Sequence, residues 1–391
     1  MVEQFNRIIF PVEFLTPHQM IEKGAIDVLA KTGTYCAMRI LPKDLEGEDF
    51  LQMMEKFRDL GIEGHMIPWP LLDVEDGYYA NEITVELFHA LVQNLLEWYK
   101  DHGFAIPEGV LVDLEPPTDP KEAKIAEKIR KETDKVKSKR KKKKIWKKIK
   151  EKTGLDKLAG INGFIKTVKT NMNKERFEAS FAKFTAMQEM MHEYGTKAIA
   201  VALPLAYEDH VDGDFRIQDF MTVPVSTVDW DQINYMIFNT DYVSASKGIV
   251  SHEDYRHLIH VYAKEFVEKY GAEKASITLG ITNLGVADVR AVQTDPKLYK
   301  MEASALLAAG LTDLGIYALD GIMEQKNPVK WIETVQSARA SDFVIDPEKI
   351  RFAQEIRRVF QAVDFISPSI LYLIESERYK KILKLAVLGK L

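Results

Sequence analysis

Two carboxylates stand close together in the segment PEGVLVDLEPP, residues 107–117. Apolar residues at 110, 112 and 114 alternate there with Leu111, Asp113 and Glu115, which is the pattern of a β-strand. Residues two apart in a strand share a face, so the side chains of Asp113 and Glu115 point the same way. Two carboxylates this close do not both ionise freely, so a protonated Glu115 could donate to a leaving oxygen beside Asp113. The alternative for so common a D-x-E is a solvated pair or one that caps the next helix.

The elements that must position these carboxylates are eight short apolar runs, which alternate with amphipathic helical stretches such as Glu82–His102 and His252–Tyr270. This alternation predicts an α/β fold, an eight-stranded (β/α)8 TIM barrel. A doubly wound sheet is disfavoured because no G-x-G-x-x-G follows any run. The predicted strands are Arg7–Phe14, Tyr35–Leu41, Gly64–Trp69, Gly109–Leu114, Ala198–Leu205, Gln232–Phe238, Ser276–Ile281 and Leu314–Leu319.

Catalytic residues of a TIM barrel lie at the carboxyl ends of the strands, where Asp113 and Glu115 fall. About 80 residues separate the fourth strand from the fifth, far more than a crossover needs. We therefore expect three parts: the barrel at 1–117 and 196–345, a basic helical insertion at 118–195, and a helical C-terminal extension at 346–391.

The composition is that of an ordinary globular protein. The 391 residues are 46% hydrophobic and 29% charged, which excludes disordered, collagen-like and coiled-coil proteins. The single cysteine, Cys36, excludes a disulfide framework and a Cys-rich zinc site. The N-terminal residues lack the pattern of a secretory leader, and nowhere do about 18 apolar residues run together. We expect a cytoplasmic protein without a membrane-spanning helix.

The net charge of −6 hides a strong asymmetry. Residues 121–150 hold 16 basic and 4 acidic side chains, a net charge of +12, so the rest of the chain carries −18. Basic residues beside a Trp and an apolar stripe are typical of a helix on an anionic membrane surface. We expect the protein to be peripheral on the inner face of a membrane, bound through Lys141, Lys142, Lys143, Lys144, Trp146, Lys147 and Lys148.

Two other partners of the basic segment remain open. It could form a solvated or protein-binding helical hairpin. Nucleic acid is the less favoured partner, because no aromatic platform or known reading motif accompanies the charge.

Three fragments carry a resemblance to a known family. Residues 108–115 resemble the fourth-strand signature of the family 18 glycoside hydrolases, the chitinase-like TIM barrels, which reads D-G-x-D-x-D-x-E. Asp113 and Glu115 match its last two acids, Glu108 stands for the first Asp, and Leu111 stands for the middle one. The segment GHMIPWP stands where this family has S-x-G-G near the third strand.

The other two fragments fall on the sixth and eighth strands. The run Met236-Ile237-Phe238-Asn239 resembles the family's M-x-Y-D, with Phe for Tyr and Asn for Asp. The run GIYALDG, residues 315–321, resembles the end of the eighth strand, where Tyr317 stands in place of the family's usual Trp and Asp320 follows.

The resemblance implies a retaining, substrate-assisted hydrolase that acts on a 2-acetamido sugar of the N-acetylglucosamine type. In this family the glutamate protonates the glycosidic oxygen while the acetamido oxygen of the sugar attacks the anomeric carbon. Carried over, Glu115 is the general acid/base and Asp113 orients the acetamido group. Asn239 is expected to donate to the acetamido carbonyl. Leu111 lacks the inner carboxylate of the family, and Phe238 lacks a hydroxyl.

Aromatic rings at strand ends are candidates for stacking on a sugar. For Trp69 and Tyr207, packing in the core is an equally weighted alternative. The expected substrate-binding residues are Tyr317, Phe238, Met236, Trp69, Tyr207 and Asp320.

No metal site or cofactor is expected. The acidic run Tyr207–Asp219 fits no cation loop by its spacing, so a solvated loop is favoured over a cation site. His252, His257 and His260 do not share one helix face.

Three functions follow from these residues. The first is the glycosidase, with a carbohydrate or glycolipid substrate, or a lipid-linked glycan, at a membrane surface. The second is a catalytically inactive chitinase-like barrel that binds glycans or glycolipids as an adaptor. The third and least favoured is an unrelated barrel enzyme in which Asp113 and Glu115 bind a metal.

Overall fold

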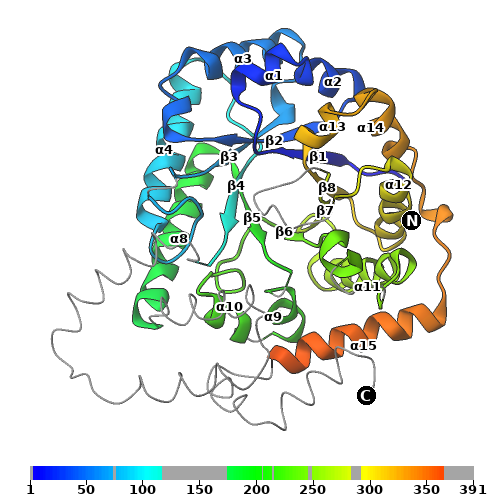
Figure 1. Ribbon diagram of the computed structural model, residues 1–391. Coiled ribbons are helices and arrows are strands. Elements are labelled where there is room, and N and C mark those ends of the chain that lie inside the picture. Colours follow the sequence, from blue (N-terminus) through cyan, green and yellow to red (C-terminus); the bar gives the residue numbers. More distant parts are fainter. Residues whose placement is uncertain are drawn as a thin grey trace, which may run out of the picture.

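Eight parallel strands form one sheet, in the order β3-β2-β1-β8-β7-β6-β5-β4, in the computed structural model of the chain (Figure 1). The end strands β3 and β4 contact each other, which closes the sheet into a barrel. The predicted TIM barrel is thereby confirmed, and each predicted run contains most of one strand. The strands are β1 Arg7–Val12, β2 Tyr35–Ile40, β3 Met66–Pro70, β4 Gly109–Leu114, β5 Lys197–Ala202, β6 Gln232–Met236, β7 Ala275–Gly280 and β8 Asp313–Tyr317.

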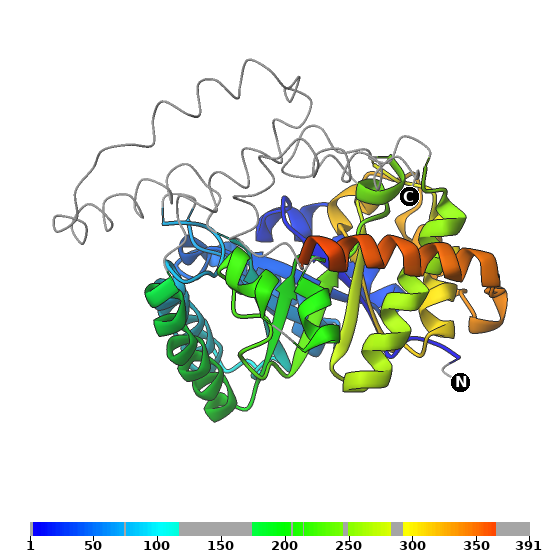
Figure 2. The same cartoon turned by 90° about the horizontal axis from the view of Figure 1, so that it is seen from below.

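The structure describes residues 3–73, 76–116, 174–204, 206–213, 215–244, 249–282 and 292–364. Helices surround the strands, as the two views in Figures 1 and 2 show. The α-helices in these ranges are α1 Pro17–Glu22, α2 Ala25–Thr32, α3 Glu48–Asp59, α4 Val85–Asp101, α8 Lys174–Tyr194, α9 Ala206–Asp212, α10 Arg216–Met221, α11 His252–Tyr270, α12 Pro296–Ala308, α13 Leu319–Met323, α14 Pro328–Gln336 and α15 Pro347–Asp364.

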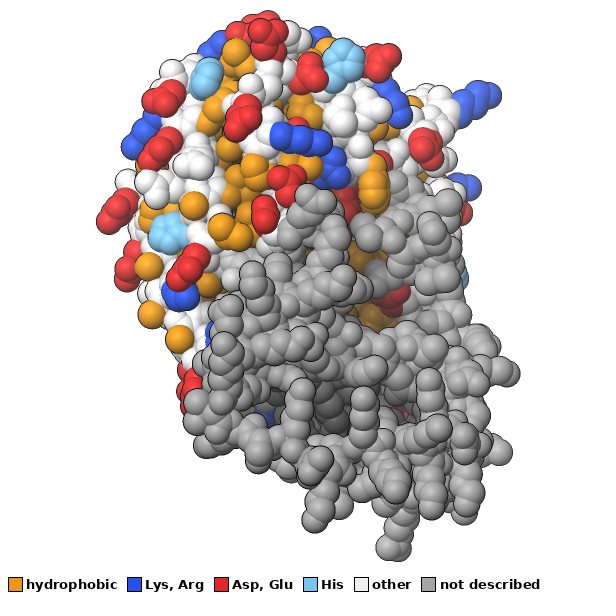
Figure 3. Space-filling view, turned by 60° about the vertical axis from the view of Figure 1, so that its left-hand side comes forward, with side chains coloured by type: hydrophobic (Ala, Val, Ile, Leu, Met, Phe, Trp, Pro, Cys, Tyr) orange, Lys and Arg blue, Asp and Glu red, His pale blue; other side chains and the backbone are white. Residues whose placement is uncertain are grey.

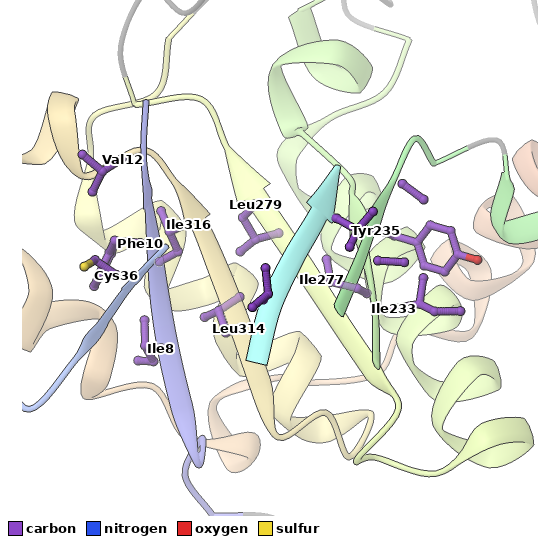
Figure 4. Close-up of a cluster of buried hydrophobic side chains, with 14 of the residues drawn as sticks. Ile8, Phe10, Val12, Cys36, Ile233, Tyr235, Ile277, Leu279, Leu314 and Ile316 are labelled. Atoms are coloured by element: carbon purple, nitrogen blue, oxygen red, sulfur yellow. The ribbon is translucent and has the colours of Figure 1, made fainter. Parts of the chain in front are cut away.

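The strands follow the two-residue alternation of a barrel. Outward-facing residues pack between the strands and the helices and form the main hydrophobic core, part of which Figure 4 shows. On β1, Ile8, Phe10 and Val12 belong to this core, whereas Ile9 and Pro11 face the barrel interior. The interior has a smaller apolar cluster of its own, made by Ile9, Ala37, Ile67, Trp69, Leu71, Leu111 and Ile199. This alternation decides which residues can reach a ligand inside the barrel.

Helix α8 belongs to the barrel. It packs on α4 and β5, and Arg176 of α8 forms a 2.7 Å ion pair with the buried Glu82 just before α4. Residues 174–194 fall within the range predicted for the basic insertion, 118–195, but their packing makes them the helix between β4 and β5. Residues 117–173, which include the predicted membrane-binding residues, lie outside the described residues.

The C-terminal extension begins with a docked helix. Helix α15 packs on α11 and α9, and its buried Arg357 pairs with Glu208 of α9 at 3.0 Å and with Glu265 of α11. Figure 2 shows α15 lying across the outside of the barrel. Residues 365–391 lie outside the described residues.

The described surface carries charges of both signs. On the face shown in Figure 3, acidic and basic side chains are interspersed with apolar ones. Among the described helices, none has the length and the apolar composition to cross a membrane.

Candidate active site

A cavity of about 410 Å³ opens into the barrel interior at the carboxyl ends of the strands. Its size lies within the range of about 300–1,000 Å³ that is usual for small-molecule sites. Inward-facing residues of all eight strands line it, with Glu13, Tyr79, Asp113, Glu115 and Asp241 contributing polar groups near the mouth. The cavity is therefore where a TIM barrel places its chemistry.

The amino end of the barrel is closed by a polar cluster. Arg7 forms a 2.6 Å ion pair with Asp313, and Gln232 donates to the same carboxylate at 2.7 Å. Arg7 also pairs with Glu108 at 3.3 Å, and Lys197 pairs with Glu108 at 3.1 Å. Glu108, the first acid of the fourth-strand signature, therefore lies at the opposite end of β4 from the cavity mouth.

Asp113 is buried in the cavity wall at 2% exposure. Burial raises the pKa of its carboxyl well above the usual range, and the negative charges of Glu115 and Glu13 act in the same direction. The indole N–H of Trp69 lies close enough to lower this pKa. Its geometry makes no hydrogen bond, because both Trp69 Nε1 and Asp113 Oδ1 lack a partner among the described residues. A ligand that donates to Asp113 would satisfy the carboxylate.

The backbone around the two carboxylates is fixed by the loop that follows β3. Ala80 forms a parallel bridge with Leu114, and its N–H donates to the carbonyl of Asp113 at 2.9 Å. This bridge joins the loop to β4 beside the cavity. Glu115 follows β4 directly, is partly exposed and lines the cavity with Asp113, as expected for residues two apart.

Glu13 is a further carboxylate of the cavity, and it is absent from the predicted site residues. It lies one residue beyond the end of β1 and is 3% exposed. The hydroxyl of Tyr317 donates to one of its oxygens, and that of Tyr78 donates to the other at 3.5 Å. Burial raises the pKa of Glu13, although these hydroxyls and Arg39 oppose the shift. Strand parity was the available signal, because Ile9, Pro11 and Glu13 share a face.

Aromatic rings form one wall of the cavity. The rings of Phe238 and Tyr317 stack with centroids 5.8 Å apart and an angle of 30° between their planes. A side chain at Gly280 would meet this wall, since a Cβ there would lie 2.9 Å from the Phe238 ring. Trp69 and Met236 also line the cavity. Four of the six predicted substrate-binding residues thus surround one space.

Three predicted site residues lie away from the cavity. Asn239 is buried and donates to Glu302 of α12 at 2.7 Å. Tyr207 is buried beside α11, where its hydroxyl donates to the carbonyl of Tyr262 at 2.8 Å. The carboxylate of Asp320 accepts from the backbone N–H groups of Glu13, Phe14 and Leu15. We leave these three residues out of the proposed site because other parts of the protein engage their polar groups.

The acidic run after β5 has structural partners. Asp209 accepts from the N–H groups of Ile217 and Gln218 and so caps α10, while Glu208 pairs with Arg357. Within the described ranges, no three His, Cys, Asp or Glu side chains are grouped as metal ligands.

The sequence matches no family model and no curated protein. Solved structures similar to the chain include the glycoside hydrolase domain of PgaB (BpsB) from Bordetella bronchiseptica, at 10% identity and a TM-score of 0.47 over 86% of this chain and 99% of that one. The catalytic domain of a GH18 chitinase from the fern Peteris ryukyuensis is 10% identical, with a TM-score of 0.42 over 85% of this chain and 99% of that one. A tryptophan synthase α-subunit from Pyrococcus furiosus is 11% identical, with a TM-score of 0.37 over 86% of this chain and 99% of that one. Likenesses of this size carry no argument about the reaction.

Proposed function

We propose that the protein is a retaining, substrate-assisted glycoside hydrolase that acts on a 2-acetamido sugar. The observation that carries the proposal is the position of Asp113 and Glu115. They lie two residues apart at the end of β4 and line one cavity at the carboxyl end of the barrel. The stacked rings of Phe238 and Tyr317 offer a flat apolar wall for the sugar.

In the proposed reaction, Glu115 donates its proton to the glycosidic oxygen as the bond to the anomeric carbon breaks. The acetamido oxygen of the sugar forms the new bond to that carbon, so the enzyme needs no nucleophile of its own. Ionised Asp113 accepts the acetamido N–H and stabilises the positive charge that develops on the ring. Glu115, now ionised, then takes a proton from a water whose oxygen bonds to the anomeric carbon, and the bond between that carbon and the acetamido oxygen breaks.

The burial of the two carboxylates supports these separate roles. Asp113 is enclosed, and one of its oxygens has no hydrogen-bond partner among the described residues, so it is suited to hold one substrate group. Glu115 is only partly buried, so it can exchange protons with water between the two steps. Leu111 and Phe238 supply no polar group here, and the acetamido group would be held mainly by Asp113.

The test is hydrolysis of chitobioside and of aryl β-N-acetylglucosaminides by the wild type and by Glu115→Gln. We expect turnover of both, and the substitution should lower turnover of chitobioside by about 10²–10⁴-fold, the usual contribution of a general acid. Glu108→Gln is the matched control, because it removes the same charge at the far end of β4 and should retain activity.

The outcomes separate the alternatives. Binding of chitooligosaccharides without turnover would favour the adaptor. Activity lost with a chelator and restored by a divalent cation would favour the metal enzyme. Turnover of chitobioside that survives undiminished in Glu115→Gln would contradict the assigned acid.

The membrane part of the proposal rests on the sequence of residues 139–148, which lie outside the described residues. A cationic segment with a Trp binds anionic bilayers, and each cation contributes about 1 kcal/mol. We propose that the sugar is carried on a lipid at such a surface. Replacing the lysines at 141–144 by Gln should abolish sedimentation with anionic liposomes while hydrolysis of soluble substrates persists.

A further inference from the structure

The carboxylate of Glu13 is a polar group of the cavity that the proposed reaction does not yet use. On β4, the inward position below Asp113 is Leu111, which is apolar, so β4 supplies no deeper acid. Glu13 instead reaches the cavity from the end of β1, a strand that does not neighbour β4 in the barrel. The cavity therefore receives a second buried carboxylate from another strand.

The position of Glu13 is fixed from three sides. Its backbone N–H donates to Asp320 at 3.1 Å. Its two carboxylate oxygens accept from the hydroxyls of Tyr317 on β8 and Tyr78 in the loop after β3. Tyr317 is itself packed against Phe238, so the group that holds Glu13 also forms the aromatic wall.

We propose that Glu13 is a positioning residue for the reaction proposed above: held by Tyr317 and Tyr78, it faces the same cavity as Asp113 and controls the protonation of Asp113 through the enclosed space. The catalytic role of Glu13 rests on the proposed function. Its effect on the protonation of Asp113 does not depend on turnover. A second negative charge in a cavity of low polarity makes the ionised form of Asp113 less stable. The same charge would stabilise the cation that forms on the sugar.

The charged and titratable groups that face Glu13 come from every neighbouring element. Arg39 of β2 attracts its negative charge, Asp320 of α13 repels it, and the two tyrosine hydroxyls stabilise it. Tyr79, Asp113, Glu115 and Asp241 also line the cavity, and the charge of Glu13 acts on Tyr79 and Asp113. Among these groups, Glu13 is the buried acid outside β4 that acts on Asp113.

The experiment measures the titration of Asp113 directly. The protein is labelled with ¹³C at the aspartate carboxyl carbons, and the Asp113 signal is assigned as the one missing from Asp113→Asn. Its chemical shift is followed against pH in the wild type and in Glu13→Gln. We expect the wild-type midpoint to lie above the ordinary value and Glu13→Gln to lower it by about one pH unit, a tenfold change in the proton affinity.

Two further variants support the comparison. Glu108→Gln removes the same charge at the other end of the barrel and should leave the midpoint unchanged. Tyr317→Phe keeps Glu13 but removes its hydrogen bond, so Glu13 stays protonated to higher pH and the Asp113 midpoint falls in the same direction by a smaller amount. Tyr317→Phe also serves if Glu13→Gln does not fold.

Activity supplies the second readout. The acidic limb of the kcat/KM profile should move to lower pH by the same amount in Glu13→Gln. A merely structural role would lower activity without moving either the limb or the Asp113 midpoint, and that result would overturn the inference. A shifted midpoint in a protein without turnover would uphold the link between Glu13 and Asp113 and contradict the proposed function instead.

Discussion

The side-chain amide of Asn239 donates a 2.7 Å hydrogen bond to Oε1 of Glu302, and both residues are buried. Gln293 donates to the same oxygen at 3.2 Å, while Oε2 has no hydrogen-bond partner within the described residues. Burial raises the pKa of Glu302 to about 7 despite these two bonds. The asparagine that was expected to contact the sugar therefore joins the segment after β6 to α12.

Glu302 should make the stability of the protein depend on pH. Because its folded-state pKa is raised, its favourable contribution is complete below the ordinary value of 4.5 and is lost as the pH rises through about 7. The loss should reach the order of 3 kcal/mol in the free energy of unfolding. Glu302→Gln stays neutral and should remove this part of the pH dependence. Urea unfolding of both proteins at pH 5 and pH 8 measures it, and equal pH dependence in the two would contradict the assignment.

The role of Glu115 predicts a dependence on the leaving group. A nitrophenolate leaves without a proton, whereas a sugar alkoxide needs one, so Glu115→Gln should lose far more activity on chitobioside than on the nitrophenyl glycoside. The expected loss on chitobioside is about 10²–10⁴-fold. Steady-state rates on both substrates test this prediction. Equal losses would show that Glu115 does not act as the acid.

The buried pair of Arg357 and Glu208 should be important for stability. Arg357→Met removes the cation that pairs with the buried Glu208 at 3.0 Å, and breaking a buried pair typically costs about 3–5 kcal/mol. The double variant Arg357→Met with Glu208→Gln should recover part of this loss. The exposed pair of Lys183 and Glu86 gives the control, since Glu86→Gln should cost less than about 1 kcal/mol. Denaturant unfolding compares the four proteins, and a small effect of Arg357→Met would contradict the prediction.

Gly315 is expected to be required by packing inside the barrel. A Cβ at this position would lie 2.0 Å from Oγ1 of Thr278, and both residues line the cavity. Gly315→Ala should therefore lower the free energy of unfolding by about 1–3 kcal/mol, as overpacking usually does. Gly64→Ala is the control, because within the described ranges no atom beyond the adjacent residues lies within 4 Å of a Cβ there. Thermal unfolding of the two variants is the measurement. Destabilisation of Gly315→Ala alone would indicate overpacking against Thr278, whereas equal destabilisation of both variants would indicate a general effect of replacing glycine.

The fold could be predicted from the sequence because its signal is repeated. Eight apolar runs between helical stretches define the barrel, and small errors at their ends do not change the count. The boundary of the insertion was harder to predict. Helix α8 has buried Phe177 and Phe184 on one face, but it follows a long basic segment, and only its packing on α4 assigns it to the barrel.

The candidate site was predictable where side chains alternate between the inside and the outside of the barrel along a strand. It was unpredictable where that alternation ends. Met236 and Phe238 share the inward face, so Asn239 at the next position turns away from the cavity. Asp320 falls in α13 after β8 has ended, and backbone N–H groups of a distant loop engage its carboxylate. Glu13 belongs to no motif, and its sequence signal is that it continues the inward alternation of Ile9 and Pro11 one position beyond the end of β1.

The pairing of β4 with β5 has a consequence for the evolution of the chain. Six residue pairs, from Gly109 with Lys197 to Leu114 with Ala202, join strands that are separated by residues 117–173. The entropy lost on closing a loop grows only with the logarithm of its length, about 0.6 kcal/mol for each doubling. Lengthening or shortening this segment therefore changes the stability of the barrel little. Selection can therefore change the length and composition of this segment without endangering the fold that carries the candidate site.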